Sequence, residues 1–477
     1  MSKFKLFIEN FLIYGVGGVI SKAVPLLMLP VITRLMPNPL YYGLADLSGA
    51  ITSFGSAIAV LGMYDAMFRY FFEKEDEEYK KDICSTTLIF TLGMSFVIFL
   101  LMLLLKEQIA TFIFSDLQYG YLVYLTAVAT FVGATNSIIA APTRMQNKRK
   151  IFLVTNTLSP IIGYSVSIPL LLNGYYVIAL PMAGVVSSLV MELAFWQMNR
   201  HWFSFRRFRL DYLRNLLKIA VPLAPTFLVY WVFNSCDRIM LADILGGQAT
   251  GIYSVGAKLG MASQLIYTAF AGGWQYFAFS TMKDKNQVES NSKVMEYLGI
   301  VSFAATLFIC AISCWFYNCL FVGEYVAGYV VSPYLFLATL LLMLYQVITN
   351  QFLVVKKTWP GVLCLSIGAM MNVGCNAWLI PQLGIEGAGL ATLIGYFVSL
   401  VLVSIVLIRM NLLVISPRFY AAVMILSICF IIWRLFFHES LLEGFGVAVF
   451  GTIGIFACYC GEFYSIWQNR NHLMSRR

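Results

Sequence analysis

Long apolar stretches alternate with short polar connections along the whole chain. Fourteen can be distinguished. They lie at about 8–33, 42–68, 83–105, 118–140, 151–172, 176–198, 216–240, 250–279, 296–321, 328–353, 360–380, 386–408, 418–437 and 443–464. A helix needs about 20 apolar residues to cross the hydrocarbon core of a bilayer. The pattern therefore predicts an all-α polytopic membrane protein with about 14 transmembrane helices.

Composition supports the same class. The 477 residues are 60% hydrophobic and only 12% charged, whereas a soluble protein carries roughly a quarter charged residues. No stretch shows the alternating pattern of an outer-membrane barrel. The ten cysteines are scattered through apolar segments, and the three histidines lie in or beside connections. This spacing predicts no metal site, no disulfide framework and no cofactor.

The first apolar run follows Lys3 and Lys5, an arrangement that superficially resembles a signal peptide. No small-residue cleavage site follows, and the run continues through Lys22 into Pro25 and Pro30. We interpret this segment as an uncleaved first span.

Basic residues gather in every second connection. Most of the 32 Lys and Arg lie on one side, with the largest groups at 69–81, 144–150, 200–218 and 283–293. Cytoplasmic loops next to spans collect such residues, so we expect both termini to be cytoplasmic. The net charge of +9 is then a signal of topology, and no nucleic-acid partner is expected.

The chain also carries an internal repeat with a separation close to 208 residues. The matching positions are Tyr42–Leu44 with Thr250–Ile252, Lys150 with Lys357, and Gly174 with Gly384. The repeat predicts two six-helix lobes, 1–205 and 206–410, followed by two additional helices and a cytoplasmic tail in 411–477. Because six spans is an even number, the lobes share one orientation and are related by an axis along the membrane normal.

Charged residues inside spans are candidate functional residues, since they are costly in lipid without a polar cavity or a partner. Lys22 and Lys258 lie at comparable depth in the two lobes. Together they would make a positive interior suited to a diphosphate or an anionic sugar, and Arg34 is a third candidate contact. The alternative is that each lysine snorkels or pairs with a carboxylate such as Asp46 or Asp237.

Two further charge pairs are candidate gates. Asp65 and Arg69 are four residues apart and so share a helix face; they predict either a cytoplasmic gate or a surface ion pair. Asp237 and Arg238 lie at the outer end of the seventh span. Pairing there with Arg34 would close the outer side.

Two segments resemble the polysaccharide biosynthesis exporters. One runs from Asp237–Ile239 through Gly247 to Gly251–Ser254, and the other comprises Leu379–Pro381 and Gly384–Thr392. These proteins are the O-antigen-type flippases of lipid-linked oligosaccharides in the multidrug/oligosaccharidyl-lipid/polysaccharide exporter superfamily. The first lobe departs from the pattern, because Tyr175–Ile178 replaces the glycine-rich turn found at Gly384.

The resemblance implies a V-shaped pair of lobes, as in the multidrug exporters of the superfamily. It also implies that the protein flips an undecaprenyl-diphosphate-linked oligosaccharide across the bacterial inner membrane during O-antigen, lipopolysaccharide or capsule-type synthesis. Such a protein is a transporter and not an enzyme. Its expected partners are the lipid-linked glycan, membrane lipids, a polysaccharide polymerase and a chain-length regulator, and we expect a monomer.

Two other functions compete with this one. A cation-coupled multidrug antiporter of the same fold would favour intramembrane carboxylates, whereas lysines predominate here at mid-depth. A membrane glycosyltransferase or polymerase usually needs a sizeable external loop or a carboxylate pair. The outer connections at 173–175, 323–327 and 381–385 are too short to hold a domain.

Overall fold

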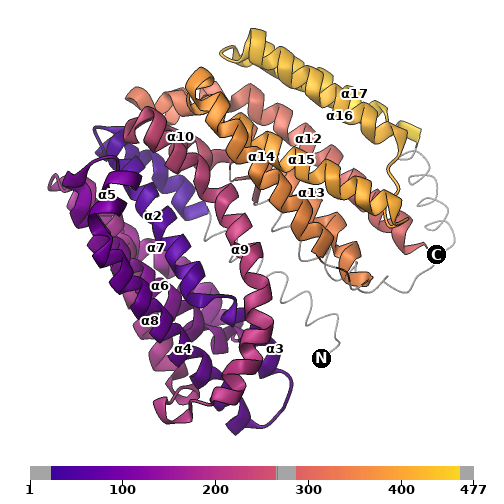
Figure 1. Ribbon diagram of the computed structural model, residues 1–477. Helices are drawn as coiled ribbons and strands as arrows, with labels where there is room; N and C mark the ends of the chain where they lie inside the picture. The colour runs from indigo at the N-terminus through magenta and orange to yellow at the C-terminus, as the bar shows by residue number, and fades with distance from the viewer. Residues whose placement is uncertain are drawn as a thin grey trace. The chain divides into compact units, whose positions relative to one another are not determined.

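The computed structural model describes residues 23–260, 262–264, 266, 286–355, 357 and 359–461, and their regular structure is entirely helical (Figure 1). The first helix covers Ala23–Leu35. Then follow α2 (Pro39–Val60), α3 (Met63–Phe71), α4 (Glu77–Leu104), α5 (Lys106–Ile113), η1 (Leu117–Tyr119), α6 (Gly120–Met145), α7 (Arg149–Leu172), α8 (Tyr176–Asn199), η2 (Arg200–Trp202), η3 (Phe205–Arg207), α9 (Leu210–Leu245) and α10 (Gly247–Gly260). The remainder comprises α12 (Gln287–Leu320), η4 (Gly323–Val330), α13 (Val331–Val354), α14 (Trp359–Leu383), α15 (Ile385–Arg409), α16 (Pro417–Ile432), η5 (Trp433–Phe437) and α17 (Leu441–Ala457).

The helices have the length and composition of membrane spans. Within the described residues, ten helices are long and apolar enough to cross a bilayer, and Ala23–Leu35 and Leu441–Ala457 are shorter apolar helices. Each of the fourteen predicted segments overlaps a described helix. The prediction of an all-helical polytopic membrane protein is confirmed.

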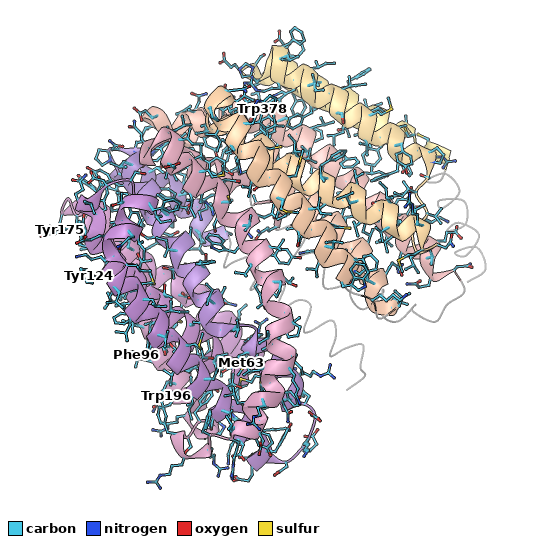
Figure 2. All side chains as sticks on the ribbon, viewed as in Figure 1. Met63, Phe96, Tyr124, Tyr175, Trp196 and Trp378 are labelled. Atoms are coloured by element: carbon cyan, nitrogen blue, oxygen red, sulfur yellow. The ribbon has the colours of Figure 1, made fainter. Side chains whose placement is uncertain are left out.

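Large apolar side chains cover the outside of the bundle. Phe96 on α4 is 53% exposed and Trp378 on α14 is 65% exposed, whereas Met63 is fully buried (Figure 2). Soluble proteins rarely expose so much contiguous apolar surface. Lipid acyl chains are the solvent that such a surface requires.

The chain forms two compact units. The first comprises Met1–Val255 with Asn376–Ala388, and the second comprises Gly256–Cys375 with Gly389–Arg477. In the first unit, α6 packs against α2, α4 and α8; in the second, α12 packs against α13, α16 and α17. The division into six-helix lobes stays a prediction.

The second predicted span consists of two helices. Leu61 and Gly62 both have positive φ, 47° and 74°, and separate α2 from α3. A Cβ on Gly62 would lie 2.7 Å from the carbonyl oxygen of Ala220 on α9. Glycine is needed there because the turn is left-handed and the neighbouring backbone approaches closely.

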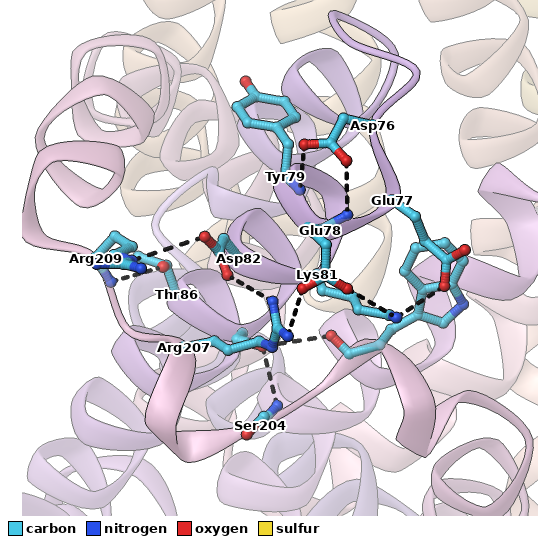
Figure 3. A network of polar contacts seen from close by, with 12 residues as sticks. Asp76, Glu77, Glu78, Tyr79, Lys81, Asp82, Thr86, Ser204, Arg207 and Arg209 are labelled. Carbon is cyan, nitrogen blue, oxygen red and sulfur yellow. Dashed lines mark hydrogen bonds and ion pairs between the residues drawn. The ribbon is translucent and has the colours of Figure 1, made fainter.

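Ion pairs and hydrogen bonds hold the connection between α8 and α9 against the start of α4 (Figure 3). Arg207 forms ion pairs with Glu78 at 2.6 Å and with Asp82 at 3.2 Å. The hydrogen bond with Glu78 raises the pKa of the Arg207 guanidinium. In addition, the Ser204 amide donates to Ser85 Oγ at 3.0 Å. These contacts fix the backbone of the connection against α4.

A buried carboxylate attaches the last two helices to α12. Glu296 is 5% exposed. It accepts hydrogen bonds from the Ser416 amide at 2.6 Å, from Ser416 Oγ at 2.8 Å and from Tyr459 Oη at 2.9 Å. One side chain therefore holds the start of α16 and the residues just after α17.

We predict that Glu296→Ala destabilises the protein by roughly 3 kcal/mol, because it leaves buried donors without an acceptor. Thermal unfolding of the purified protein in detergent measures the change, and limited proteolysis should show faster cleavage after α15. Glu289→Ala is the matched control: that residue pairs with exposed Lys293 on the same helix, so its loss should change stability little. Equal effects of the two substitutions would contradict the assignment.

Candidate functional site

A buried ion pair joins α2 to α9. The Nε atom of Arg238 lies 2.5 Å from Oδ2 of Asp46, and the two side chains are only 10% and 12% exposed. Arg238 also donates to the carbonyl oxygen of Asn234, one turn back on α9. Removal of either charge alone would leave the other buried without its ion-pair partner.

Asp237, the neighbour of Arg238, is held by neutral donors. Tyr253 Oη on α10 donates to Oδ2 at 2.7 Å, and Asn376 Nδ2 on α14 donates to Oδ1 at 2.6 Å. Asp237 is 4% exposed. Consecutive residues of α9 therefore project into two polar contacts, one with α2 and one with α10 and the end of α14.

A third helix contacts the same carboxylate. Ser254 Oγ on α10 donates to Asp46 Oδ2 at 2.7 Å, across a sequence separation of 208 residues. Gly43 and Gly251 are separated by the same number, and a Cβ on Gly251 would lie 3.1 Å from the Gly43 nitrogen. Positions 208 residues apart thus meet each other.

The backbones of α2 and α10 touch at glycines. A Cβ on Gly43 would lie 2.2 Å from the Gly247 oxygen, and a Cβ on Gly251 would lie 1.9 Å from the Pro39 oxygen. Gly247 and Gly251 form the small-xxx-small spacing that lets membrane helices pack closely. At Gly43 and Gly251 no other residue type fits without separating the helices.

Two further hydrogen bonds hold α9 against other parts of the first unit. Trp231 Nε1 donates to the carbonyl oxygen of Ala50 on α2 at 3.0 Å. Ser115 Oγ, in the connection before η1, donates to the carbonyl oxygen of Ala242 at 3.2 Å. The end of α9 predicted to face outward is therefore held along three turns.

Asp46 also borders a cavity of about 270 Å³ between α2, α6 and α8. Hydroxyl groups of Ser48, Thr52, Thr126 and Ser188 are part of its lining. The carboxylate thus lies between the Arg238 guanidinium and a partly polar space inside the first unit.

Of the three residues predicted to contact the substrate, the two that the structure describes differ in their exposure. Lys22 lies outside the described residues. Arg34 is exposed on the helix Ala23–Leu35, and Lys258 is partly buried on α10. Their roles stay predictions.

The predicted gating residues form one exposed pair and one buried pair. Asp65 and Arg69 are both exposed on α3, and within the described part of the chain they form no ion pair with each other. Asp237 and Arg238 are buried and contact residues of α2, α10 and α14. The pairing with Arg34 stays a prediction. The sequence did not predict the ion pair between Arg238 and Asp46. The 208-residue separation of Asp46 and Ser254, which equals the repeat, was the signal that could have placed Asp46 at this contact.

Solved structures show which class of membrane protein has this fold. A lipid II flippase MurJ in an inward closed conformation superimposes with a TM-score of 0.70 at 15% identity, over 95% of this chain and 100% of that one. An inward-facing multidrug resistance MATE family transporter of the MOP superfamily gives 0.64 at 15% identity, over 83% and 98%. A MOP superfamily transporter from Pyrococcus furiosus gives 0.61 at 15% identity, over 84% and 95%. The chain has the fold of MOP-superfamily transporters.

The family follows from the sequence itself. A family model described as polysaccharide biosynthesis protein matches residues 7–283, more than half of the chain. The chain therefore belongs to the polysaccharide biosynthesis protein family. No curated protein matches it.

We predict that Asp46→Ala destabilises the protein by about 3–5 kcal/mol, because buried Arg238 loses the carboxylate with which it forms its ion pair. The double variant Asp46→Ala/Arg238→Met should recover most of this loss, since it removes both charges. Thermal unfolding in detergent measures each variant. Asp65→Ala, which removes an exposed carboxylate from α3, is the control and should have little effect. A double variant no more stable than Asp46→Ala would show that the pair is not the cause.

Proposed function

We propose that this protein is a non-enzymatic flippase that moves an undecaprenyl-diphosphate-linked oligosaccharide outward across the bacterial inner membrane. Membership of the polysaccharide biosynthesis protein family supports it, as does a fold shared with a protein named as a lipid II flippase. The physical task suits the fold. A hydrophilic glycan crosses between helices while its polyprenyl chain stays in lipid.

One observation carries the proposal most directly. The contact of α2 with α9 and α10 combines a buried ion pair, Asp46 with Arg238, and a direct backbone approach at Gly43 and Gly251. Alternating access requires a contact that seals one side and then separates. In our proposal this contact seals the outward side, and the predicted gate at Asp237 and Arg238 acts through it.

The substrate contacts remain those that the charge pattern predicts. Lys258 is one turn along α10 from Ser254, and residues four apart share a helix face. In our proposal Lys258, Lys22 and Arg34 attract the diphosphate or acidic sugars, and Asp65 with Arg69 forms the cytoplasmic gate.

The setting follows from the function. We propose surface polysaccharide synthesis of the O-antigen or capsule type, in the inner membrane with both termini cytoplasmic. A polysaccharide polymerase and a chain-length regulator would act on the flipped glycan, and the flippase would work as a monomer.

A cation-coupled multidrug antiporter is the second candidate. The buried Asp237 carboxylate, which accepts hydrogen bonds from Tyr253 and Asn376, is the observation in its favour. An antiporter predicts drug resistance in cells that overproduce the protein. A flippase predicts accumulation of lipid-linked glycan on the cytoplasmic face when the gene is deleted.

We predict that Lys22→Gln/Lys258→Gln abolishes surface glycan, because the path loses the positive charge that attracts the substrate. Immunoblotting of the glycan and of the membrane-inserted protein measures both properties. Lys74→Gln/Lys218→Gln is the control: it removes two exposed lysines and should leave the glycan unchanged. Normal surface glycan from the first variant would refute the role of the two lysines.

A further inference from the structure

A second pocket lies at the other end of the first unit, away from the charged network. It lies between α4, α8 and the connection from α8 to α9, and its volume is about 410 Å³. This volume is within the range of sites that bind small molecules. Its lining consists of Ser85, Leu88, Ile89, Trp196, Phe203, Ser204, Phe205 and Arg206. None of these residues belongs to α2, α9, α10 or α14, the helices of the candidate functional site.

The pocket has an apolar body and a cationic rim. Trp196 and Phe203 stack with ring centroids 6.0 Å apart and planes 11° apart, next to Leu88 of α4. Phe205 at the rim is 70% exposed. Arg206 beside it is exposed, and within the described residues its side chain has no hydrogen bond or ion pair.

Neighbouring charges leave Arg206 available for a ligand. Arg207 is paired with Glu78 and Asp82, and Asp82 also pairs with Arg209 at 3.7 Å. Glu78 is further neutralised by Lys81. The ion pairs drawn in Figure 3 therefore neutralise Glu78 and Asp82 of α4. They also fix the connection between α8 and α9, so that Arg206 stays at the pocket.

The position of the pocket indicates its occupant. Ser85–Ile89 lie within the first turns of α4 after its charged start, and Trp196 lies in the last turn of α8. Both places mark the boundary between the apolar core and the polar edge of a membrane, where aromatic residues gather. A ligand there would have an apolar chain and an anionic head.

We propose that this pocket binds an anionic phospholipid, whose phosphate contacts Arg206 and whose acyl chain enters between Leu88, Ile89 and Trp196. Charge complementarity favours it, because basic residues on the cytoplasmic side attract anionic lipids. Separation from the proposed glycan path favours bulk phospholipid over the polyprenyl-diphosphate substrate.

Quenching of Trp196 by lipid tests the proposal. The full-length protein is placed in phosphatidylcholine nanodiscs that contain increasing fractions of phosphatidylglycerol with brominated acyl chains. The difference in quenching between the wild type and Trp196→Phe isolates this tryptophan. Brominated phosphatidylcholine should quench it only at several-fold higher fractions.

Variants separate a built site from diffuse attraction. Arg206→Ala should raise the phosphatidylglycerol fraction for half-maximal quenching about fivefold, as expected for one basic contact. Arg214→Ala removes an exposed arginine of α9 that does not line the pocket. It should change the phosphatidylglycerol fraction for half-maximal quenching less than twofold. Ile89→Phe keeps the charge but fills the pocket, and should reduce quenching.

Three results would overturn the proposal. They are equal effects of Arg206→Ala and Arg214→Ala, equal quenching by phosphatidylcholine, and displacement of phosphatidylglycerol by an undecaprenyl diphosphate at low molar ratio. The last would assign the pocket to the substrate instead. None of them bears on whether the protein is a flippase.

Discussion

The ion pair between Asp46 and Arg238 is the constraint on which the packing of α2 against α9 depends. Two charges with side chains 10–12% exposed must remain together or meet water, because an unpaired buried charge costs several kcal/mol. Ser254 adds a third helix to the same carboxylate. Any motion that parts α2 from α9 and α10 must therefore supply water or a polar ligand at this place.

The glycines give this polar contact its geometry. Gly43 and Gly251 bring the backbones of α2 and α10 together so closely that the short side chains of Asp46 and Ser254 can meet. Close packing of small residues holds membrane helices together where hydrophobic burial cannot, since lipid is as apolar as the helix surface. The contact is thus close and depends on few groups.

Sequence periodicity predicted the fold well, because an apolar run of about 20 residues has few alternatives in a membrane. It failed at Leu61–Gly62, where a left-handed turn and the approach of Ala220 divide a continuous apolar run. The burial of Asp237 and Arg238 follows from their place in an apolar helix, but the partner of Arg238 does not. Pairing with Asp46 depends on how α2 packs against α9, which charge patterns along one helix do not encode.

A reversible crosslink between α2 and α10 tests the central claim most directly. Leu40→Cys and Gly247→Cys, in a variant without the native cysteines, place two thiols where a Cβ on Gly247 would lie 2.6 Å from the Leu40 side chain. If this contact opens in each transport cycle, oxidation will stop the movement of lipid-linked oligosaccharide in proteoliposomes and reduction will restore it. Unchanged transport by the fully crosslinked protein would contradict the account.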